Sequence, residues 1–182
     1  VACSRGMVYA TTDGGNTFNP TGLNWTQVNN RLIRRMLMDR DDPNIILLAS
    51  TNGIYRTING GNTWTQVQTG NFYDIEAKPG TNETTWYAST SSTIFKSTNE
   101  GQSWSSVYSI TGSNRINMTV SDANPNYVYF ISSLSSNSGF KGLYRSIDSG
   151  ANFTLRSSSP NLLTHSSTGS GTGGQGWYDL AF

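Results

Sequence analysis

The segment Thr57-Ile58-Asn59-Gly60-Gly61-Asn62-Thr63-Trp64 is the most informative part of the chain, because three similar segments recur elsewhere in the sequence. These four boxes span residues 11–18, 57–64, 97–104 and 146–153. Each begins with Ser or Thr, has Asp or Asn third and Gly fifth, and ends with Trp or Phe. Their third positions lie 40 to 49 residues apart, a period that is typical of solenoids and propellers.

Four short β-strands are predicted around each complete box, which joins the third strand to the fourth. Runs of β-forming residues alternate with turn-forming residues, and no segment has a helical period of 3.6 residues. The predicted strands of the three repeats are 32–38, 45–50, 54–57 and 63–67; 73–77, 85–89, 94–97 and 103–107; and 115–120, 127–131, 143–146 and 152–155. A single strand is predicted at 7–10, and the first strand of another repeat at 176–182.

This pattern predicts an all-β fold, a partial β-propeller of four-stranded antiparallel blades of which about three are complete. We expect residues 1–182 to be part of a single propeller domain. Its expected parts are the end of a blade (1–30), three blades (31–70, 71–110 and 111–160), and a loop with the first strand of a further blade (161–182). Propellers usually close with about 4–8 blades, so the remaining blades are expected from further sequence or from another chain.

The box residues are expected to shape the turn between two strands. An Asp or Asn side chain can accept backbone N–H groups of its own loop, and Gly supplies a positive φ. The final aromatic ring is expected to cover the hairpin and pack against the neighbouring sheet. The positions with this structural role are Asp13, Gly15, Phe18, Asn59, Gly61, Trp64, Asn99, Gly101, Trp104, Asp148, Gly150 and Phe153.

Composition excludes several functional classes. Charged residues make up 13% of the chain and the net charge is +1, so no nucleic-acid partner is expected. No apolar run approaches the ~20 residues that a membrane span needs. Cys3 is the only cysteine, which excludes an internal disulfide, and we expect neither a metal site nor a cofactor. The low charge and the abundance of polar turn residues are common in extracellular β-proteins.

The boxes and their context resemble the Asp-box (BNR) repeats of sialidases, xyloglucanase-type glycoside hydrolases, sortilin-type receptors and secreted bacterial proteins. Segments 53–57, 142–146 and 42–45 are similar to the xyloglucanase and sortilin-like branch, and segment 173–181 resembles large secreted BNR-repeat proteins of Bacteroidetes-type bacteria. The resemblance implies a secreted or cell-surface propeller whose boxes lie on the face away from the active site. Asn59 and Asn99 depart from the name-giving Asp, which fits a structural role for this position.

Candidate ligand-binding residues are therefore expected on the face opposite the boxes. Two polar loops are predicted there, at 132–142 and at 156–176, the second either functional or flexible. Alignment of the first strands makes three polar residues equivalent, and the segment 178–181 adds a fourth. The candidates are Arg35, Tyr73, Asp74, Asn117, Trp177, Tyr178 and Asp179.

Three interpretations of these residues stay open. They could line a hydrated channel and satisfy one another's hydrogen bonds. They could instead bind a glycan or peptide, because sugar rings are recognised by aromatic faces and a few polar groups. In the boldest interpretation, Asp74 and Asp179 are the carboxylate pair of an inverting glycosidase, whose carboxyl groups lie about 6.5–9.5 Å apart.

The favoured function is a secreted or cell-surface module that binds polysaccharide or another glycan and could also process it. If the protein is an enzyme, the resemblance implies a glycoside hydrolase. One alternative is a non-catalytic propeller of the sortilin type that binds protein or peptide. Another is a structural spacer in a large adhesin.

Overall fold

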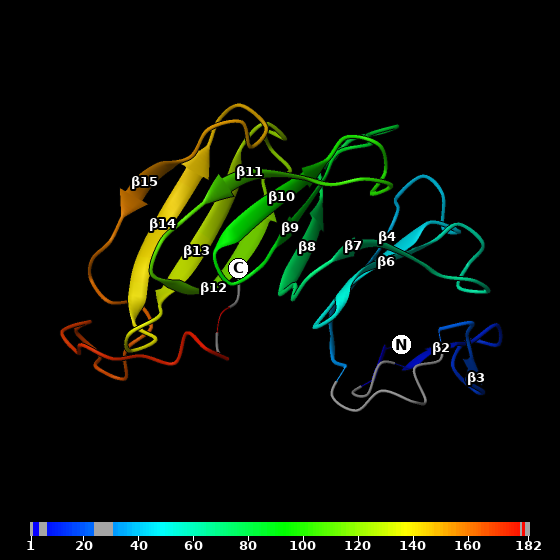
Figure 1. Ribbon diagram of the computed structural model, residues 1–182, viewed down its shortest axis with the longest axis horizontal. Coiled ribbons are helices and arrows are strands. Elements are labelled where there is room, and N and C mark those ends of the chain that lie inside the picture. The colour runs from blue at the N-terminus through cyan, green and yellow to red at the C-terminus, as the bar shows by residue number, and fades with distance from the viewer. Residues whose placement is uncertain (1, 4–6, 24–30, 179, 181–182) are drawn as a thin grey trace.

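The computed structural model describes residues 2–3, 7–23, 31–178 and 180, and their regular elements are β-strands (Figure 1). Blade 1 consists of β4 (Ile33–Met38), β5 (Ile46–Ser50), β6 (Gly53–Thr57) and β7 (Thr65–Thr69). Blade 2 consists of β8 (Asp74–Ala77), β9 (Trp86–Ser89), β10 (Thr93–Ser97) and β11 (Ser105–Ser109). Blade 3 consists of β12 (Ser113–Val120), β13 (Val128–Leu134), β14 (Phe140–Ser146) and β15 (Thr154–Ser157).

Each blade is an antiparallel meander in which consecutive strands are neighbours. A smaller sheet of β1 (Ala2–Cys3), β2 (Met7–Ala10) and β3 (Asn19–Pro20) precedes blade 1. The sheets lie side by side in chain order, so the chain forms part of a β-propeller (Figure 1). The predicted fold class is confirmed. The described residues contain no helix that is long and apolar enough to span a membrane.

The hydrophobic core is divided among the interfaces between neighbouring sheets. Leu47 and Ile54 of blade 1 pack with Ile75 and Trp86 of blade 2 in one fully buried cluster. A second cluster joins blades 2 and 3 around Tyr87, Ile94, Ile116, Met118 and Phe130. A third joins the N-terminal sheet to blade 1 through Val8, Leu23, Leu48 and Tyr55. Each blade therefore buries its apolar face only against its neighbour, as the repeat period suggested.

The boxes form the turns between the third and fourth strands, and their side chains hydrogen-bond to their own backbone. In the box at 57–64, the Thr57 hydroxyl accepts the N–H of Gly61 at 3.0 Å and donates to Asn59 Oδ1 at 2.9 Å. Asn59 Oδ1 also accepts the N–H of Thr63 at 2.9 Å. The same three bonds recur in the other boxes. The polar positions of the box thus hold the turn closed.

The final aromatic residue of a box lies in the turn and not at the start of the fourth strand, which begins one residue later than Trp64, Trp104 and Phe153. The reason is local, because the box hydrogen bonds extend to the residue before each ring. Trp64 packs on the N-terminal sheet, Trp104 on blade 1 and Phe153 on blade 2. Phe18 is 48% exposed, and its packing on a neighbouring sheet stays a prediction.

Two predictions at the opposite end of the strands need correction. The segment 132–142 is mainly strand, because β13 runs to Leu134, β14 begins at Phe140, and Ser133 pairs with Phe140 across them. The segment 176–178 is a turn, and the strand predicted at 176–182 does not begin there. Residues 179, 181 and 182 of that prediction lie outside the described residues. Ser132 and Ser133 are buried and pair with β14, so tertiary packing overrides their weak strand preference.

Candidate ligand-binding site

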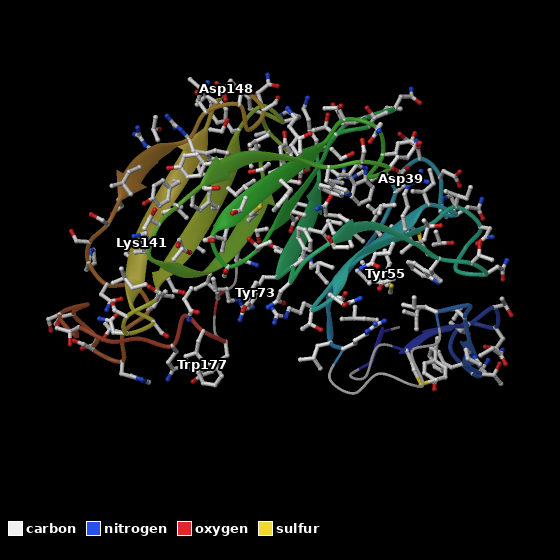
Figure 2. All side chains as sticks on the ribbon, in the orientation of Figure 1. Asp39, Tyr55, Tyr73, Lys141, Asp148 and Trp177 are labelled. Atoms are coloured by element: carbon white, nitrogen blue, oxygen red, sulfur yellow. The ribbon has the colours of Figure 1, made fainter. Side chains whose placement is uncertain are left out.

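The loops that could hold a ligand gather at the end of the blades opposite the boxes. They are the link between β7 and β8, the turn between β13 and β14, and the segment that follows β15. Figure 2 shows Tyr73 and Trp177 at this end of the molecule and Asp148, a box residue, at the other. This separation follows from the antiparallel meander, in which alternate connections emerge on opposite sides of a blade.

A pocket of about 490 Å³ lies at this end, between the inner strands and the segment after β15. Its lining comes from β4, the residue before β8, β12 and the turn at 176–178. The lining residues are Arg34, Tyr73, Asn114, Arg115, Trp177 and Tyr178. Within this lining, the two arginines are the only charged side chains.

Two β-bulges place polar residues at the pocket. The register between β4 and β5 shifts between Ile33 and Arg35, so Arg34 is the extra residue of the inner strand. A second shift between Ser113 and Arg115 makes Asn114 the extra residue of β12. A bulge bends its strand and changes the direction of a side chain. The two bulges therefore bring side chains of blades 1 and 3 toward the pocket from both sides of blade 2.

Tyr73 lies between the two arginines of the pocket. The Cζ atom of Arg34 is 3.6 Å from the centroid of the Tyr73 ring, and that of Arg115 is 5.6 Å away. Both distances fall within the range of a cation–π interaction. Phe72, which is fully buried, fixes the backbone beside Tyr73, and the Tyr73 N–H donates to Ser89 O at 2.7 Å. The ring thus holds a defined position for the arginines to stack on.

Trp177 and Tyr178 form an exposed aromatic pair on the other side of the pocket. Their ring centroids are 4.1 Å apart at an interplanar angle of 66°, and the residues are 61% and 49% exposed. The Arg115 Nη1 atom donates to the carbonyl oxygen of Trp177 at 3.1 Å. The Gly176 N–H donates to Ser138 O at 3.0 Å. These contacts hold the turn against blade 3 while its rings face outward.

The Asn161 side chain makes several of the hydrogen bonds that hold the segment between β15 and the aromatic pair. Asn161 Nδ2 donates to the carbonyl oxygens of Gly171 at 2.8 Å and Gly173 at 3.0 Å. Asn161 Oδ1 accepts the N–H of Phe140 at 2.8 Å. Of the two roles considered for this loop, these bonds favour a defined conformation that supports the site.

A buried polar cluster lies next to the pocket on the three inner strands. Arg35, Asp74 and Asn117 occupy the same position of β4, β8 and β12, as their partners across each sheet show. Asp74 Oδ2 accepts hydrogen bonds from Asn117 Nδ2 and from the Met118 N–H, each at 2.8 Å. Arg35 Nε lies 3.7 Å from Asp74 Oδ1. Asp74 therefore links blade 2 to both of its neighbours.

Burial changes the acidity of two carboxyl groups in this cluster. Desolvation raises the pKa of Asp74, although the Met118 N–H and the Arg35 guanidinium act in the opposite direction. Desolvation, together with the nearby Asp74 charge, raises the pKa of Glu76 to about 7. Arg35 Nη2 contacts Glu76 Oε1 at 2.5 Å. Glu76 is thus a partly buried acid that titrates near neutral pH.

The structure brings together most of the residues predicted from the sequence, in two adjacent groups. Tyr73, Trp177 and Tyr178 line the pocket, whereas Arg35, Asp74 and Asn117 form the buried cluster. Asp179 lies outside the described residues. The ligand-binding role of all seven stays a prediction.

Sequence reasoning missed four residues, Arg34, Glu76, Asn114 and Arg115. Arg34 and Arg115 carried a usable signal, because each is a charged residue near the start of an inner strand. The bulges that direct Arg34 and Asn114 into the pocket had no such signal. No group of three or more His, Cys, Asp or Glu side chains that could hold a metal occurs among the described residues.

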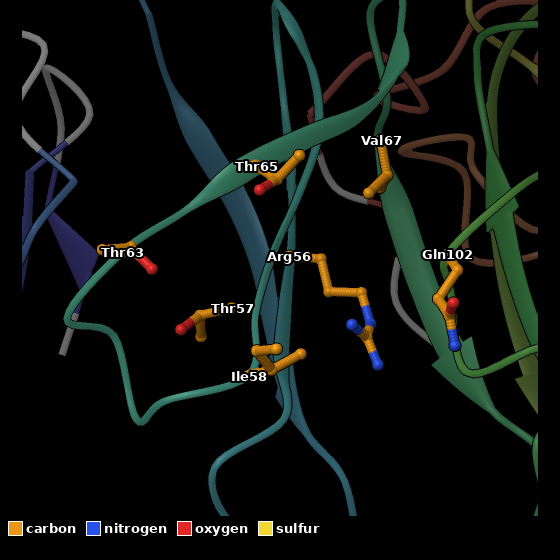
Figure 3. Close-up of a pocket in the computed structure, with 7 residues that line it drawn as sticks. All are labelled: Arg56, Thr57, Ile58, Thr63, Thr65, Val67 and Gln102. Carbon is orange, nitrogen blue, oxygen red and sulfur yellow. The ribbon is translucent and has the colours of Figure 1, made fainter.

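A second hollow of about 240 Å³ lies on the box side, between blades 1 and 2 (Figure 3). Figure 3 shows the Arg56 side chain reaching toward Gln102 across this hollow. Arg56 Nε donates to Glu100 O at 2.8 Å, and its Nη2 atom lies 3.3 Å from Glu100 Oε2. The one cation of the hollow is therefore engaged in holding two blades together, and we interpret this hollow as structural.

Solved structures of GH74 enzymes are similar to the chain. An ancestral GH74 enzyme matches 82% of the chain with a TM-score of 0.67 and 22% identity. The GH74 enzyme of Niastella koreensis matches 82% with a TM-score of 0.58 and 22% identity. The GH74 xyloglucanase of Xanthomonas campestris matches 88% with a TM-score of 0.62 and 16% identity.

The chain spans 21%, 22% and 27% of the lengths of these three structures. At this level of identity, the likeness shows the propeller fold alone. Neither a protein-family model nor a curated protein matches the chain.

Proposed function

We propose that the chain is part of an extracellular, glycan-binding propeller module of the Asp-box type, and that the pocket beside Tyr73 holds the sugar. The observation that carries this proposal is the pair of exposed rings, Trp177 and Tyr178, at the mouth of a pocket of about 490 Å³. Sugar rings stack on aromatic faces, and a few polar groups then fix their orientation. The low charged fraction of 13% supports an extracellular location.

We further propose that residues 1–182 belong to one propeller domain with the blade boundaries expected from the repeat. The continuous cores between neighbouring sheets support this arrangement. Three complete blades are fewer than the about 4–8 of a closed propeller, so the ring would be completed by further sequence or by another chain. The pocket lies at the inner strands, where propellers commonly hold their ligands.

The burial of Asp74 supports binding of a glycan without its hydrolysis. Its side chain is 1% exposed, and both of its carboxylate oxygens already accept hydrogen bonds. A catalytic carboxylate needs access to the glycosidic bond, which this burial opposes. The other candidate, Asp179, lies outside the described residues. We therefore propose glycan binding only, and the experiment below also measures whether the chain hydrolyses the glycan.

The test is binding of the full chain to a panel of polysaccharides that includes xyloglucan, with release of reducing ends measured in parallel. We expect binding without hydrolysis, and we expect Trp177→Ala to weaken binding about tenfold or more, since covering a large apolar side chain is worth roughly 1.5–3 kcal/mol. Phe18→Ala is the matched control, because Phe18 is an exposed ring outside the pocket. Binding to no glycan, together with capture of a peptide at the same pocket, would favour the protein-binding alternative. Binding to neither would favour the structural spacer.

A further inference from the structure

The pocket beside Tyr73 concentrates positive charge, although the net charge of the whole chain is close to zero. The net charge of the protein is +1, yet two of the six lining residues are arginines and none of the six is acidic. A pocket lined by one sign of charge attracts ligands of the opposite sign.

Arg34 has unused hydrogen-bonding capacity. Its Nη1 atom is buried and has no hydrogen-bond partner among the described residues, and stacking on Tyr73 at 3.6 Å fixes the plane of the guanidinium. Arg35, Arg40 and Arg56, in contrast, each contact a carboxylate. A buried donor without an acceptor destabilises the fold. A ligand that carries a hydrogen-bond acceptor could therefore satisfy Arg34.

Arg115 connects the cationic side of the pocket to its aromatic side. Its guanidinium carbon lies 5.6 Å from the Tyr73 ring, and its Nη1 atom donates to the carbonyl of Trp177 at 3.1 Å. It therefore positions the exposed rings relative to Arg34. A ligand that spans the pocket would meet a planar cation at one end and two aromatic faces at the other.

We propose that this pocket binds a carboxylated glycan, with the carboxylate of a uronic acid residue at the Arg34 guanidinium and a sugar ring on Trp177 or Tyr178. This inference rests on the glycan-binding function proposed above and adds the chemical class of the sugar. A guanidinium presents a planar fork of N–H donors that matches the two oxygens of a carboxylate. Lysine, a point charge, would not supply the same geometry.

The experiment compares two probes with the same sugar backbone, one with free carboxylates and one in which each carboxylate is a neutral methyl ester. The full chain is titrated calorimetrically with an oligogalacturonate and with the fully methyl-esterified form of the same oligosaccharide. We expect the acid form to bind about tenfold tighter or more, the size expected of a charge-assisted hydrogen bond. Its affinity should fall as the salt concentration rises, while that of the ester changes little.

Arg34→Gln should abolish the preference for the acid form, so that the ratio of its affinity to that of the ester falls to about one. Arg34→Lys should restore part of the preference, because it restores the charge without the fork. Arg40→Gln is the matched control, since Arg40 is exposed and pairs with Asp122 away from the pocket. Near-ultraviolet circular dichroism of each variant reports whether the fold is retained.

Equal affinity for the two probes, or no effect of Arg34→Gln, would overturn the acidic-sugar inference and leave the proposed function standing. If neither probe nor any neutral glycan binds, the proposed function itself fails. If polyglutamate displaces the acid probe while the ester never binds, the pocket recognises an acidic protein, and both proposals are wrong.

Discussion

At the scale of single residues, the fifth position of each box shows why the pattern repeats. Gly61, Gly101 and Gly150 have φ values of 96°, 76° and 79°, a region that glycine adopts without steric cost. The same position also packs closely on the preceding sheet. A Cβ atom on Gly101 would lie 2.1 Å from Leu47 Cδ2, and one on Gly150 would lie 2.9 Å from Tyr87 Cε1. Glycine is therefore required both for the turn and for the contact between blades.

Gly101→Ala should lower the free energy of unfolding by roughly 2–4 kcal/mol, because it combines backbone strain with overpacking against buried Leu47. Gly15→Ala is the matched control. Gly15 has a φ of 96°, but its nearest neighbour for a Cβ atom is Phe18 Cζ at 3.9 Å. Gly15→Ala should thus lower the free energy of unfolding only by the backbone strain, about 1–2 kcal/mol. Urea denaturation of both variants measures the difference.

A double variant separates the clash from the strain. Leu47→Ala removes the side chain that the new methyl group would meet, so Leu47→Ala with Gly101→Ala should be more stable than the sum of the single effects predicts. Additive effects in this cycle, or equal losses for Gly101→Ala and Gly15→Ala, would contradict the proposed contact.

At the scale of elements, the inner strands are joined by side chains and not only by apolar packing. β4 contacts β8 through the pair Arg35–Glu76, and β8 contacts β12 through Asp74, Asn117 and the Met118 N–H. The inner strand of each blade is a sheet edge, and edges leave N–H groups unpaired. Asp74 supplies the acceptor for one of these groups. The polar cluster thus covers an otherwise unsatisfied edge between two blades.

The pH dependence of stability should reveal Glu76. Burial and the nearby Asp74 charge raise its pKa from an ordinary 4.5 to about 7, so the folded state binds more protons between these pH values. Linkage then requires stability to be fully present below about pH 4.5 and to be lost as pH rises through about 7. Glu76→Gln should remove most of this loss, on the order of 2 kcal/mol.

Urea unfolding at several pH values between these limits measures that slope. The pKa of Asp74 is also raised. In Glu76→Gln, the unfolding free energy should therefore still fall with pH, but less steeply. A Glu76→Gln protein whose stability falls with pH as steeply as that of the parent would show that Glu76 is not the titrating group.

At the scale of the whole molecule, one contact recurs from blade to blade. The cation before each box reaches a turn carbonyl in the next box: Arg56 Nε donates to Glu100 O at 2.8 Å, and Lys96 Nζ donates to Ser149 O at 2.7 Å. Glu100 and Ser149 occupy the same box position and both have a φ of 56°. Arg145 is the third cation of this series, and its Nε atom is buried without a hydrogen-bond partner among the described residues.

This series predicts that Lys96→Met lowers the free energy of unfolding by about 1.5–3 kcal/mol, the net value of a hydrogen bond to a charged group. Arg145→Met should cost less than about 0.5 kcal/mol, because no box turn among the described residues accepts from it. Urea denaturation of the two variants gives the comparison. Equal losses would show that the cation stabilises its own blade and not the joint with the next. A following blade, where one is present, is expected to dock its box on Arg145.

The sequence by itself determined the blades. Each box carries its own hydrogen-bonding groups within eight residues, and each strand is a short run of β-forming residues. Local interactions of this kind can be recognised from the sequence alone. The fold class could therefore be predicted, and each blade strand could be located to within a few residues. Strand ends were less accurate at the boxes, where side-chain bonds to the backbone move the boundary, and at the hairpin of β13 and β14, where each strand extends three residues beyond the prediction.

Only the tertiary structure decided how the site is built. Arg34 and Asn114 reach the pocket through bulges, and a bulge depends on which residue is left unpaired across two strands. Arg35, Glu76 and Asp74 meet because neighbouring blades bring distant residues together, and burial then changes their acidity. Contacts of this kind depend on residues some forty positions apart in sequence, such as Asp74 and Asn117. The sequence repeat identifies each blade, but the ion pairs and hydrogen bonds between blades depend on how the blades pack.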